Sequence, residues 1–375
     1  MNLFDVYPLF PITPVQAKGS WIWDDKGVKY LDLYGGHAVI SIGHTHPHYV
    51  QAVTEQLHKI AFYSNSVQNP LQEQLAEKLG ALSGYPDYQL FLCNSGAEAN
   101  ENALKIASFQ TGRKKVIAFK KAFHGRTSGA VAATDNPKIV SPFNNGHEVV
   151  FLPLNDETAL VDTLDETVAA VIIEGIQGVG GIQVPEDSFL QLLERQCQQH
   201  GALLILDEIQ SGYGRTGRFF AHQHAGIRPD LITMAKGMGN GFPVGGVLIN
   251  SRIPAWSGML GTTFGGNYLA CVASLAVLEV IESERLMENA GSQGAWCIAA
   301  LKQQKSLLDV RGRGLMIGFD LPETQKTVRN NLLMQHHIFT GEAKPNAIRL
   351  LPSLAVSREE LELFMAALAD EIIGV

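Results

Sequence analysis

The chain has 375 residues, enough to fold as two domains that each bury a hydrophobic core. Its apolar fraction of 46% and charged fraction of 18% are ordinary for a soluble globular protein, and no apolar run reaches the ~18 residues that would suggest a membrane helix. The net charge of -8 argues against nucleic acid or an anionic membrane as the main partner, and the N-terminus lacks the basic start of a secretory signal, so we expect a cytoplasmic location.

The first 44 residues are predicted to contain a β-hairpin. Two stretches rich in aromatic and aliphatic residues, 20–23 and 28–31, flank a turn at Asp25-Lys26-Gly27. A glycine at the end of such a short polar stretch is typical of a tight turn between paired strands.

The central part of the chain, from about residue 116 to residue 250, alternates apolar runs with turn signals and helical patterns. Clear runs lie at 116–119, 170–173 and 203–206. Continuous apolar runs of this length are typical of strands buried on both faces, as in a parallel sheet. Together with the helical patterns between them, they predict an α/β fold.

After residue 270 the pattern predicts a long helical stretch, a strand near 315–318, a helix around 327–337, a strand at 347–351 and a final helix from Ser357. We expect the two chain ends to form one smaller domain against the central one. The predicted division is an N-terminal segment 1–44, which packs with the small domain, a large domain 45–270 and a small C-terminal domain 271–375.

Residues 94–101 combine a helix start with a close backbone approach. Ser95 and Glu98 fit a capping box, and Ala99, Ala103 and Ile106 would share the inner face of the helix. Free N–H groups at a helix start bind phosphate well. By itself, this pattern is far more often that of an ordinary capped helix.

Residues 122–127, Ala-Phe-His-Gly-Arg-Thr, place an aromatic ring and a guanidinium in one predicted loop. Phe123 could stack on a flat ring, and Arg126 could hold a carboxylate through paired hydrogen bonds. A core phenylalanine beside a surface arginine is the simpler alternative.

Two buried strands end in ionisable side chains. The run 203–206 is followed by Asp207, and the strand predicted near 231–234 is followed by Lys236 and a glycine-rich stretch. Ligands in open α/β sheets bind outside the carboxyl ends of strands, and desolvation of a lysine there lowers its pKa and suits Schiff-base chemistry. Taken alone, Asp207 is more readily explained as a helix cap or surface charge, and Lys236 as an exposed lysine at a strand end.

Taken together and in this order, these segments resemble the class-III (subgroup II) aminotransferases of the pyridoxal-phosphate (PLP) fold-type-I family. The resemblance extends from the N-terminal hairpin and Gly-His-Thr-His-Pro at 43–47 to Arg-Leu-Leu-Pro at 349–352. It implies an α/β fold with a large domain around a mostly parallel central sheet and a smaller α+β domain built from both chain ends.

The resemblance implies PLP as the cofactor and assigns roles around its ring. Lys236 would hold PLP as a Schiff base and carry the proton between substrate and cofactor carbon atoms. Asp207 would pair with the protonated pyridine nitrogen. Gln210 would hydrogen-bond the ring 3-oxygen, and Phe123 would stack on one ring face.

For the phosphate, the resemblance implies Ser95, Gly96 and Ala97 as donors from the chain itself. Thr263 matches the family threonine that reaches the phosphate of the neighbouring subunit. A homodimer with active sites shared across its interface follows, and two-fold dimers are also the commonest assemblies.

Within the family, the sequence is most similar to the acetylornithine aminotransferase subgroup. This implies transfer of the side-chain amine of an N-acylornithine, most readily N-acetylornithine, to 2-oxoglutarate in arginine biosynthesis. Arg126 would bind the carboxylate far from the reacting amine, and Arg349 would bind the carboxylate next to the reacting carbon of glutamate or 2-oxoglutarate.

The sequence departs from the family pattern at 173–181, Ile-Glu-Gly-Ile-Gln-Gly-Val-Gly-Gly. Gly175 replaces the usual proline, and Val179 replaces the usual glutamate that covers the second arginine. An uncovered, partly buried Arg349 is costly. Another acidic group, water or the substrate's acyl group would have to cover it, or the amine donor differs from the subgroup norm.

His37 is a second departure, since an apolar residue is more usual there. A packed, hydrogen-bonded histidine is the simplest interpretation. We hypothesise in addition that His37 and the region around Val179 shape the acyl pocket, because an N-succinyl group adds a carboxylate that a histidine could recognise.

Other functions stay open on sequence alone. The amine donor could be N-succinylornithine, ornithine or 4-aminobutyrate. A glutamate-semialdehyde aminomutase shares the lysine site, although Arg126 and Arg349 favour a dicarboxylate acceptor. A PLP-binding protein without activity is disfavoured by the full set of Lys236, Asp207, Gln210 and Arg126.

We predict neither disulfides nor a metal site. Cys93, Cys197, Cys271 and Cys297 form no CxxC pair, so packed, reduced thiols are expected. His44 and His46 have a metal-like spacing, but nothing near them in the sequence completes a ligand set.

Overall fold

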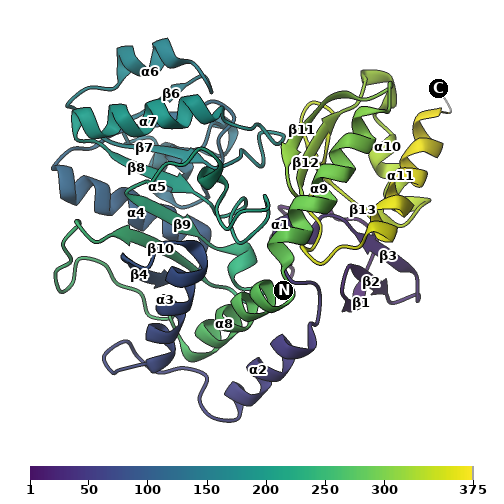
Figure 1. Ribbon diagram of the computed structural model, residues 1–375, viewed down its shortest axis with the longest axis horizontal. Helices are drawn as coiled ribbons and strands as arrows, with labels where there is room; N and C mark the ends of the chain where they lie inside the picture. Colours follow the sequence, from purple (N-terminus) through teal and green to yellow (C-terminus); the bar gives the residue numbers. More distant parts are fainter. Residues whose placement is uncertain (374–375) are drawn as a thin grey trace.

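The structure, a computed structural model, describes residues 1–373 of the chain. Two lobes lie side by side (Figure 1). The larger contains a seven-stranded sheet, and the smaller contains the first strands of the chain together with its last strands and helices.

The central sheet has the strand order β4-β10-β9-β8-β7-β5-β6. Strands β5 to β9 are parallel to one another, whereas β10 runs antiparallel to both β4 and β9. The predicted mostly parallel α/β sheet is therefore confirmed. Its strands are β4 (Tyr88–Cys93), β5 (Lys115–Phe119), β6 (Val149–Leu152), β7 (Val168–Glu174), β8 (Leu203–Asp207), β9 (Leu231–Met234) and β10 (Gly245–Asn250).

Helices cover both faces of this sheet, so its central strands are buried on both sides. Every residue of β7 and β8 is buried. Alternate side chains of β5, β7 and β8 pack against α4 (Gly96–Thr111) on one face and α7 (Asp187–His200) on the other. This explains the continuous apolar runs, and the expected inner residues Ala99, Ala103 and Ile106 of α4 are all buried.

The smaller lobe joins the two chain ends. The strands β1 (Pro14–Lys18), β2 (Trp21–Asp24) and β3 (Lys29–Asp32) form an antiparallel meander, and β13 (Ile338–Phe339) adds in parallel to β3. A second, antiparallel sheet has the order β11-β12-β15-β14. Its strands are β11 (Leu308–Arg313), β12 (Met316–Asp320), β14 (Gly341–Ala343) and β15 (Ala347–Leu350).

Three predicted helices in the second half differ from their expected bounds. The long helical stretch after residue 270 is two helices, α8 (Tyr268–Ser283) and α9 (Leu286–Lys302), because Arg285 between them adopts a left-handed φ of 53°. The helix expected at 327–337 is α10 (Val328–Met334), and left-handed His337 separates it from β13. The final helix, α11 (Arg358–Ile373), begins one residue after the predicted start.

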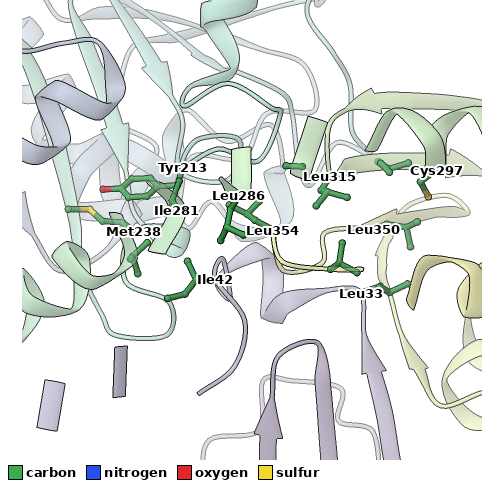
Figure 2. Packing of buried hydrophobic residues seen from close by; sticks show 14 of the residues in the cluster. Leu33, Ile42, Tyr213, Met238, Ile281, Leu286, Cys297, Leu315, Leu350 and Leu354 are labelled. Carbon is green, nitrogen blue, oxygen red and sulfur yellow. The ribbon is translucent and has the colours of Figure 1, made fainter. Parts of the chain in front are cut away.

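One hydrophobic core connects the lobes (Figure 2). Buried residues of this cluster run from Tyr213 and Ile281 beside the large sheet, through Leu286, to Leu315 and Leu350 in the small one. On the large-lobe side, α8 packs against α2 (Pro47–Leu57) and α3 (Pro70–Ser83). This continuous core holds the strands of the large sheet in a fixed position relative to β15.

A buried arginine adds polar contacts between the lobes. Arg215, in the loop after β8, donates through Nη1 to the carbonyl oxygens of Leu315 and Pro352. Burial lowers the pKa of Arg215 to about 10. These contacts tie the loop that follows Asp207 directly to the strand and turn that flank Arg349.

The cysteines and the paired histidines pack against protein groups. All four cysteines are buried, and burial raises the pKa of Cys93, Cys271 and Cys297 to about 12. His44 contacts Asp32 at 2.9 Å, and His46 contacts Glu284 at 2.8 Å, so each has its own carboxylate. Within residues 1–373 no group of three or more His, Cys, Asp or Glu side chains could hold a metal ion, and no helix is both long and apolar enough to cross a membrane.

Candidate active site

A cavity of about 390 Å³ lies at the carboxyl ends of β7, β8 and β9. Its walls also include the start of α4 and the loop that follows β5. The structure therefore brings together residues that lie more than a hundred positions apart in the sequence. Among the predicted site residues, those that line it are Ser95, Gly96, Ala97, Phe123, Arg126, Asp207, Gln210 and Lys236.

Lys236 follows β9 and begins a short 3₁₀ turn with a left-handed φ of 46°. Its removal from water lowers the pKa of the amine, opposed by the charges of Asp207 and Glu174 and reinforced by that of Arg349. None of the ion pairs within residues 1–373 involves Lys236. A larger share of this amine is thus uncharged near neutral pH, which suits a nucleophile.

Asp207 is 4% exposed and fixed by a hydrogen-bond network. Its Oδ2 accepts from Asn100 Nδ2 and contacts His124 Nδ1, both at 2.8 Å, while its Oδ1 accepts from the Ile209 N–H at 3.1 Å. Asn100 in turn accepts from the Thr233 hydroxyl at 2.7 Å. The carboxylate is held rigidly at the cavity wall, where it would stabilise a positive charge.

Asn100 and His124 have no role in the predictions made from the sequence. Both lie inside motifs that those predictions singled out, 94–101 and 122–127. A buried asparagine on the alanine-rich face of α4 was the signal that could have revealed this network, because a buried amide requires hydrogen-bond partners.

Glu174, the last residue of β7, is a further group that the sequence left without a role. Its Oε1 accepts from the Phe123 N–H at 3.0 Å and its Oε2 from the Gly178 N–H at 2.9 Å. Burial raises the pKa of Glu174 to about 7, with His124 lowering it and Asp207 raising it further. This side chain joins the loop of Phe123 to the turn that follows β7.

The start of α4 has the expected cap but not the complete capping box. The Ser95 hydroxyl oxygen accepts from the Glu98 N–H at 3.2 Å, whereas the Glu98 carboxylate accepts from the Asn94 N–H at 2.5 Å and not from that of Ser95. A Cβ on Gly96 would lie 2.8 Å from the Ile209 side chain, so glycine permits this close approach. The cavity thus meets the N-terminal end of a 16-residue helix, which attracts anions.

Thr263 is the one predicted cofactor residue that does not line the cavity of its own chain. It lies exposed in the loop between β10 and α8. The neighbouring Thr262 instead turns inward, where its hydroxyl oxygen accepts from Asn94 Nδ2 at 3.2 Å and from the Gly265 N–H at 3.1 Å.

The two predicted arginines have different surroundings. Arg126 is exposed at the cavity rim, with its guanidinium carbon 6.0 Å from the centre of the Phe123 ring. Arg349, in β15, is only 4% exposed, and burial lowers its pKa. Neither takes part in any of the ion pairs within the described part of the chain.

Backbone carbonyl groups, and not an acidic side chain, bind the buried arginine. Arg349 donates through Nε to the carbonyl oxygen of Glu342 at 2.9 Å and through Nη1 to that of Gly178 at 3.0 Å. The Glu342 carboxylate itself pairs with Arg329 at 2.7 Å. Within residues 1–373 no acidic side chain forms an ion pair with Arg349, although the charges of Glu174 and Glu342 raise its pKa against the effect of burial.

Val179 and His37 lie beside this arrangement. Val179 lines the cavity with 47% of its surface exposed. His37 forms a hydrogen bond with the Tyr34 hydroxyl, and its carbonyl oxygen accepts from Gln210 Nε2 at 3.2 Å. His37 is hydrogen-bonded as expected and its ring packs against that of Tyr34, but the residue is exposed and lies outside the hydrophobic core.

The groups around the cavity fit PLP in kind. They comprise an amine with a lowered pKa, a buried carboxylate in a fixed orientation, an aromatic ring and a helix N-terminus. The flat, apolar walls from Phe123, Ile209 and Val244 suit a ring, and the start of α4 suits its phosphate.

Comparisons with known proteins agree with this fit. The family model described as aminotransferase class-III matches residues 5–372. The acetylornithine aminotransferase of Archaeoglobus fulgidus is 41% identical over 364 residues, covering 96% of each chain, and that of Bacillus subtilis is 40% identical over 380 residues, covering 99% of this chain and 97% of its own.

Solved structures give the same result for the fold. The ornithine aminotransferase of Toxoplasma gondii, in a structure with partial occupancy of PLP, is 28% identical with a TM-score of 0.90 and covers 98% of this chain and 91% of its own. An (S)-enantioselective ω-transaminase from Thermomicrobium roseum is also 28% identical, with a TM-score of 0.89 over 99% of this chain and 96% of its own.

Proposed function

The chain belongs to the class-III aminotransferase family, and we propose that it transfers the side-chain amine of an N-acylornithine to 2-oxoglutarate. N-acetylornithine is the preferred amine donor in this proposal. The enzyme class and the PLP cofactor follow from the family, and the products are the acylglutamate semialdehyde and glutamate. Relatives named acetylornithine aminotransferase match nearly the whole chain at about 40% identity, which supports arginine biosynthesis as its pathway.

The observation that carries this proposal is a pair of arginines that form no ion pair within the described residues. Arg126 lines the cavity together with Lys236, and Arg349 lies outside the cavity lining but its charge acts on Lys236. N-acylornithine has its carboxylate far from the reacting amine, whereas glutamate reacts next to a carboxylate. Arg126 at the rim would bind the distant carboxylate in both half-reactions. Arg349 would bind the near carboxylate of glutamate or 2-oxoglutarate.

When bound, PLP supplies an electron sink that makes the C–H bond next to the reacting nitrogen acidic. Lys236 Nζ is the base that takes this proton and returns it, since its pKa is lowered by burial. Asp207, oriented by Asn100 and His124, stabilises a protonated ring nitrogen. Phe123 and Ile209 form walls that exclude water from the reacting atoms.

Ser95, Gly96 and Ala97 would bind the phosphate, and Gln210 would bind the ring 3-oxygen. We also propose a homodimer in which Thr263 completes the phosphate site of the partner subunit. The exposure of Thr263 supports this, as do the exposed apolar side chains near it. Phe62 and Phe264 have ring centres 5.3 Å apart, and both are exposed. Such a patch is typical of an interface.

We further propose the division into an N-terminal segment 1–44, a large PLP-binding domain 45–270 and a small domain 271–375, and a cytoplasmic location. The pairing of β13 with β3 supports a small lobe made from both chain ends.

A panel of amine donors with 2-oxoglutarate as acceptor tests the proposed reaction. N-acetylornithine should give the highest kcat/KM, and N-succinylornithine, ornithine and 4-aminobutyrate are the alternatives. A donor without a distant carboxylate that reacts best would refute the role of Arg126. A glutamate-semialdehyde aminomutase would be recognised by turnover that needs no 2-oxoglutarate.

A further inference from the structure

Arg349 forms its hydrogen bonds with uncharged groups from distant parts of the chain, while the charges of Glu174, Glu342 and Arg329 also act on it. In addition to its two carbonyl acceptors, its guanidinium carbon lies 5.9 Å from the centre of the Tyr34 ring. The Tyr34 ring rests on the backbone of Gly341, where a Cβ would lie 2.4 Å from Cε2, and Gly341 pairs with Arg349 across β14 and β15. Tyr34 is therefore built into the surroundings of this arginine.

His37 extends this arrangement toward the cavity. Its ring nitrogen Nδ1 is hydrogen-bonded to the Tyr34 hydroxyl, and its carbonyl oxygen binds Gln210. The segment that carries it has left-handed backbone at Gly35, Gly36, His37 and Ala38, which is unfavourable for the last two. Asp32 fixes the start of the segment by accepting from the N–H groups of Tyr34 and Gly35 at 3.0 and 2.8 Å.

Strain in two non-glycine residues persists only where the surrounding structure imposes it. The effect of this backbone is to place the His37 ring against the Tyr34 hydroxyl, with ring centres 4.7 Å apart. Tyr34 thus lies between Arg349 and His37, and the His37 ring can accept a hydrogen bond from the Tyr34 hydroxyl.

We propose that Tyr34 and His37 cover Arg349 as an uncharged hydrogen-bonding pair, in place of an acidic residue at position 179, and that the near carboxylate of 2-oxoglutarate or glutamate displaces this cover. The inference rests on the proposed function, in which Arg349 binds that carboxylate. It makes Tyr34 and His37 positioning residues that determine how readily Arg349 becomes available.

The charges of the site keep the pair neutral. Burial raises the pKa of Tyr34, with Arg349 and Arg329 opposing the rise, so the phenol keeps its proton. Partial removal of the His37 ring from water also lowers its pKa, and the charges of Arg349 and Lys236 lower it further. The Nδ1 atom of a neutral imidazole can accept a hydrogen bond from the Tyr34 hydroxyl. The lone pairs of the phenol oxygen are then free to accept a hydrogen bond from Arg349.

A neutral cover has a different consequence from an acidic one. A carboxylate at position 179 would form an ion pair that the incoming substrate must break, whereas a hydroxyl gives up a single hydrogen bond. Arg349 should therefore bind dicarboxylates more readily in this chain than in a variant that carries an acid there.

Calorimetric titration of the PLP-loaded enzyme with glutarate, an unreactive dicarboxylate, tests the proposal without depending on the amine donor. Tyr34→Phe should tighten glutarate binding by about 3- to 10-fold, because the carboxylate no longer displaces a hydroxyl. Val179→Glu should weaken it by about 10-fold or more. His37→Ala should act in the direction of Tyr34→Phe, whereas His37→Asn, which keeps an acceptor and tolerates left-handed backbone, should restore most of the wild-type affinity.

Tyr30→Phe is the matched control, since it deletes a hydroxyl from the same N-terminal segment, bonded to Asp24 and not to the site. It should bind glutarate as the wild type does. Equal glutarate affinity of wild type, Tyr34→Phe and Val179→Glu would overturn the proposal, as would the absence of glutarate binding in all of them. Failure of the proposed function would look different, namely no turnover of wild type with acetylornithine.

Discussion

Asn100→Ala is the substitution that most directly probes the Asp207 network. The Asn100 side chain is fully buried and makes three hydrogen bonds, to Asp207 Oδ2 at 2.8 Å, to the His124 carbonyl oxygen at 2.7 Å and from the Thr233 hydroxyl at 2.7 Å. Each buried group left without a partner costs ~1–3 kcal/mol, of which water entering the cavity restores part. We expect a loss of stability of ~3 kcal/mol and, because Asp207 loses its fixed orientation, about tenfold weaker PLP binding.

Thermal unfolding of the cofactor-free protein and a PLP titration followed by absorbance measure the two effects. The matched control is Asn102→Ala in the same helix, because Asn102 Nδ2 donates only to the Glu98 carbonyl oxygen at 2.8 Å and lies outside the cavity. If the two variants unfold at the same temperature and bind PLP equally well, the network does not orient Asp207 and the argument from buried hydrogen bonds is wrong.

Three other outcomes are expected. Lys236→Ala should lose transamination and the absorbance of covalently bound PLP while its far-UV circular dichroism stays that of the wild type; turnover in this variant would contradict the assignment of Lys236. Because burial raises the Glu174 pKa from 4.5 to about 7, the folded state binds the extra proton, and the stability of the cofactor-free protein should fall by up to ~3 kcal/mol as pH rises from 4.5 to 7. Glu174→Gln should remove that part of the slope in denaturant unfolding, and an unchanged slope would exclude Glu174 as its source. His37→Ala should change the ratio of kcat/KM for acetylornithine to that for succinylornithine, and an unchanged ratio would remove His37 from the acyl pocket.

The sequence predicted best those features that a local pattern determines. Strands β7 and β8 are buried on both faces, so their residues 170–173 and 203–206 are apolar without alternation. Such a continuous apolar run can be recognised from the sequence alone. The cap of α4 by Ser95 is equally local, since donor and acceptor are three residues apart.

Features that depend on a single dihedral angle or on distant contacts could not be predicted. The apolar pattern continues on both sides of Arg285, so it does not mark the left-handed φ of this residue that divides α8 from α9. The two-residue strand β13 forms only because β3 offers it an edge, three hundred positions earlier in the chain.

The candidate active site shows the same contrast between features that a local pattern determines and features that depend on distant contacts. Lys236 and Asp207 follow apolar strands and could be placed from the sequence, whereas the role of Glu174 depends on the N–H groups of Phe123 and Gly178 that folding brings to it. The surroundings of Arg349 combine residues 34, 178 and 342, so the missing acid at 179 was visible in the sequence but its replacement was not.

The absence of an acid at position 179 also affects the lysine. The charges of Asp207 and Glu174 already raise the pKa of Lys236 against the effect of its burial, and Arg349 lowers it. A carboxylate at Val179, which lines the same cavity, would add a further negative charge and would neutralise part of the effect of Arg349. Both changes favour the protonated amine. Because position 179 carries no acid, neither change occurs, and the charge of Arg349 keeps its full effect in lowering the pKa of Lys236.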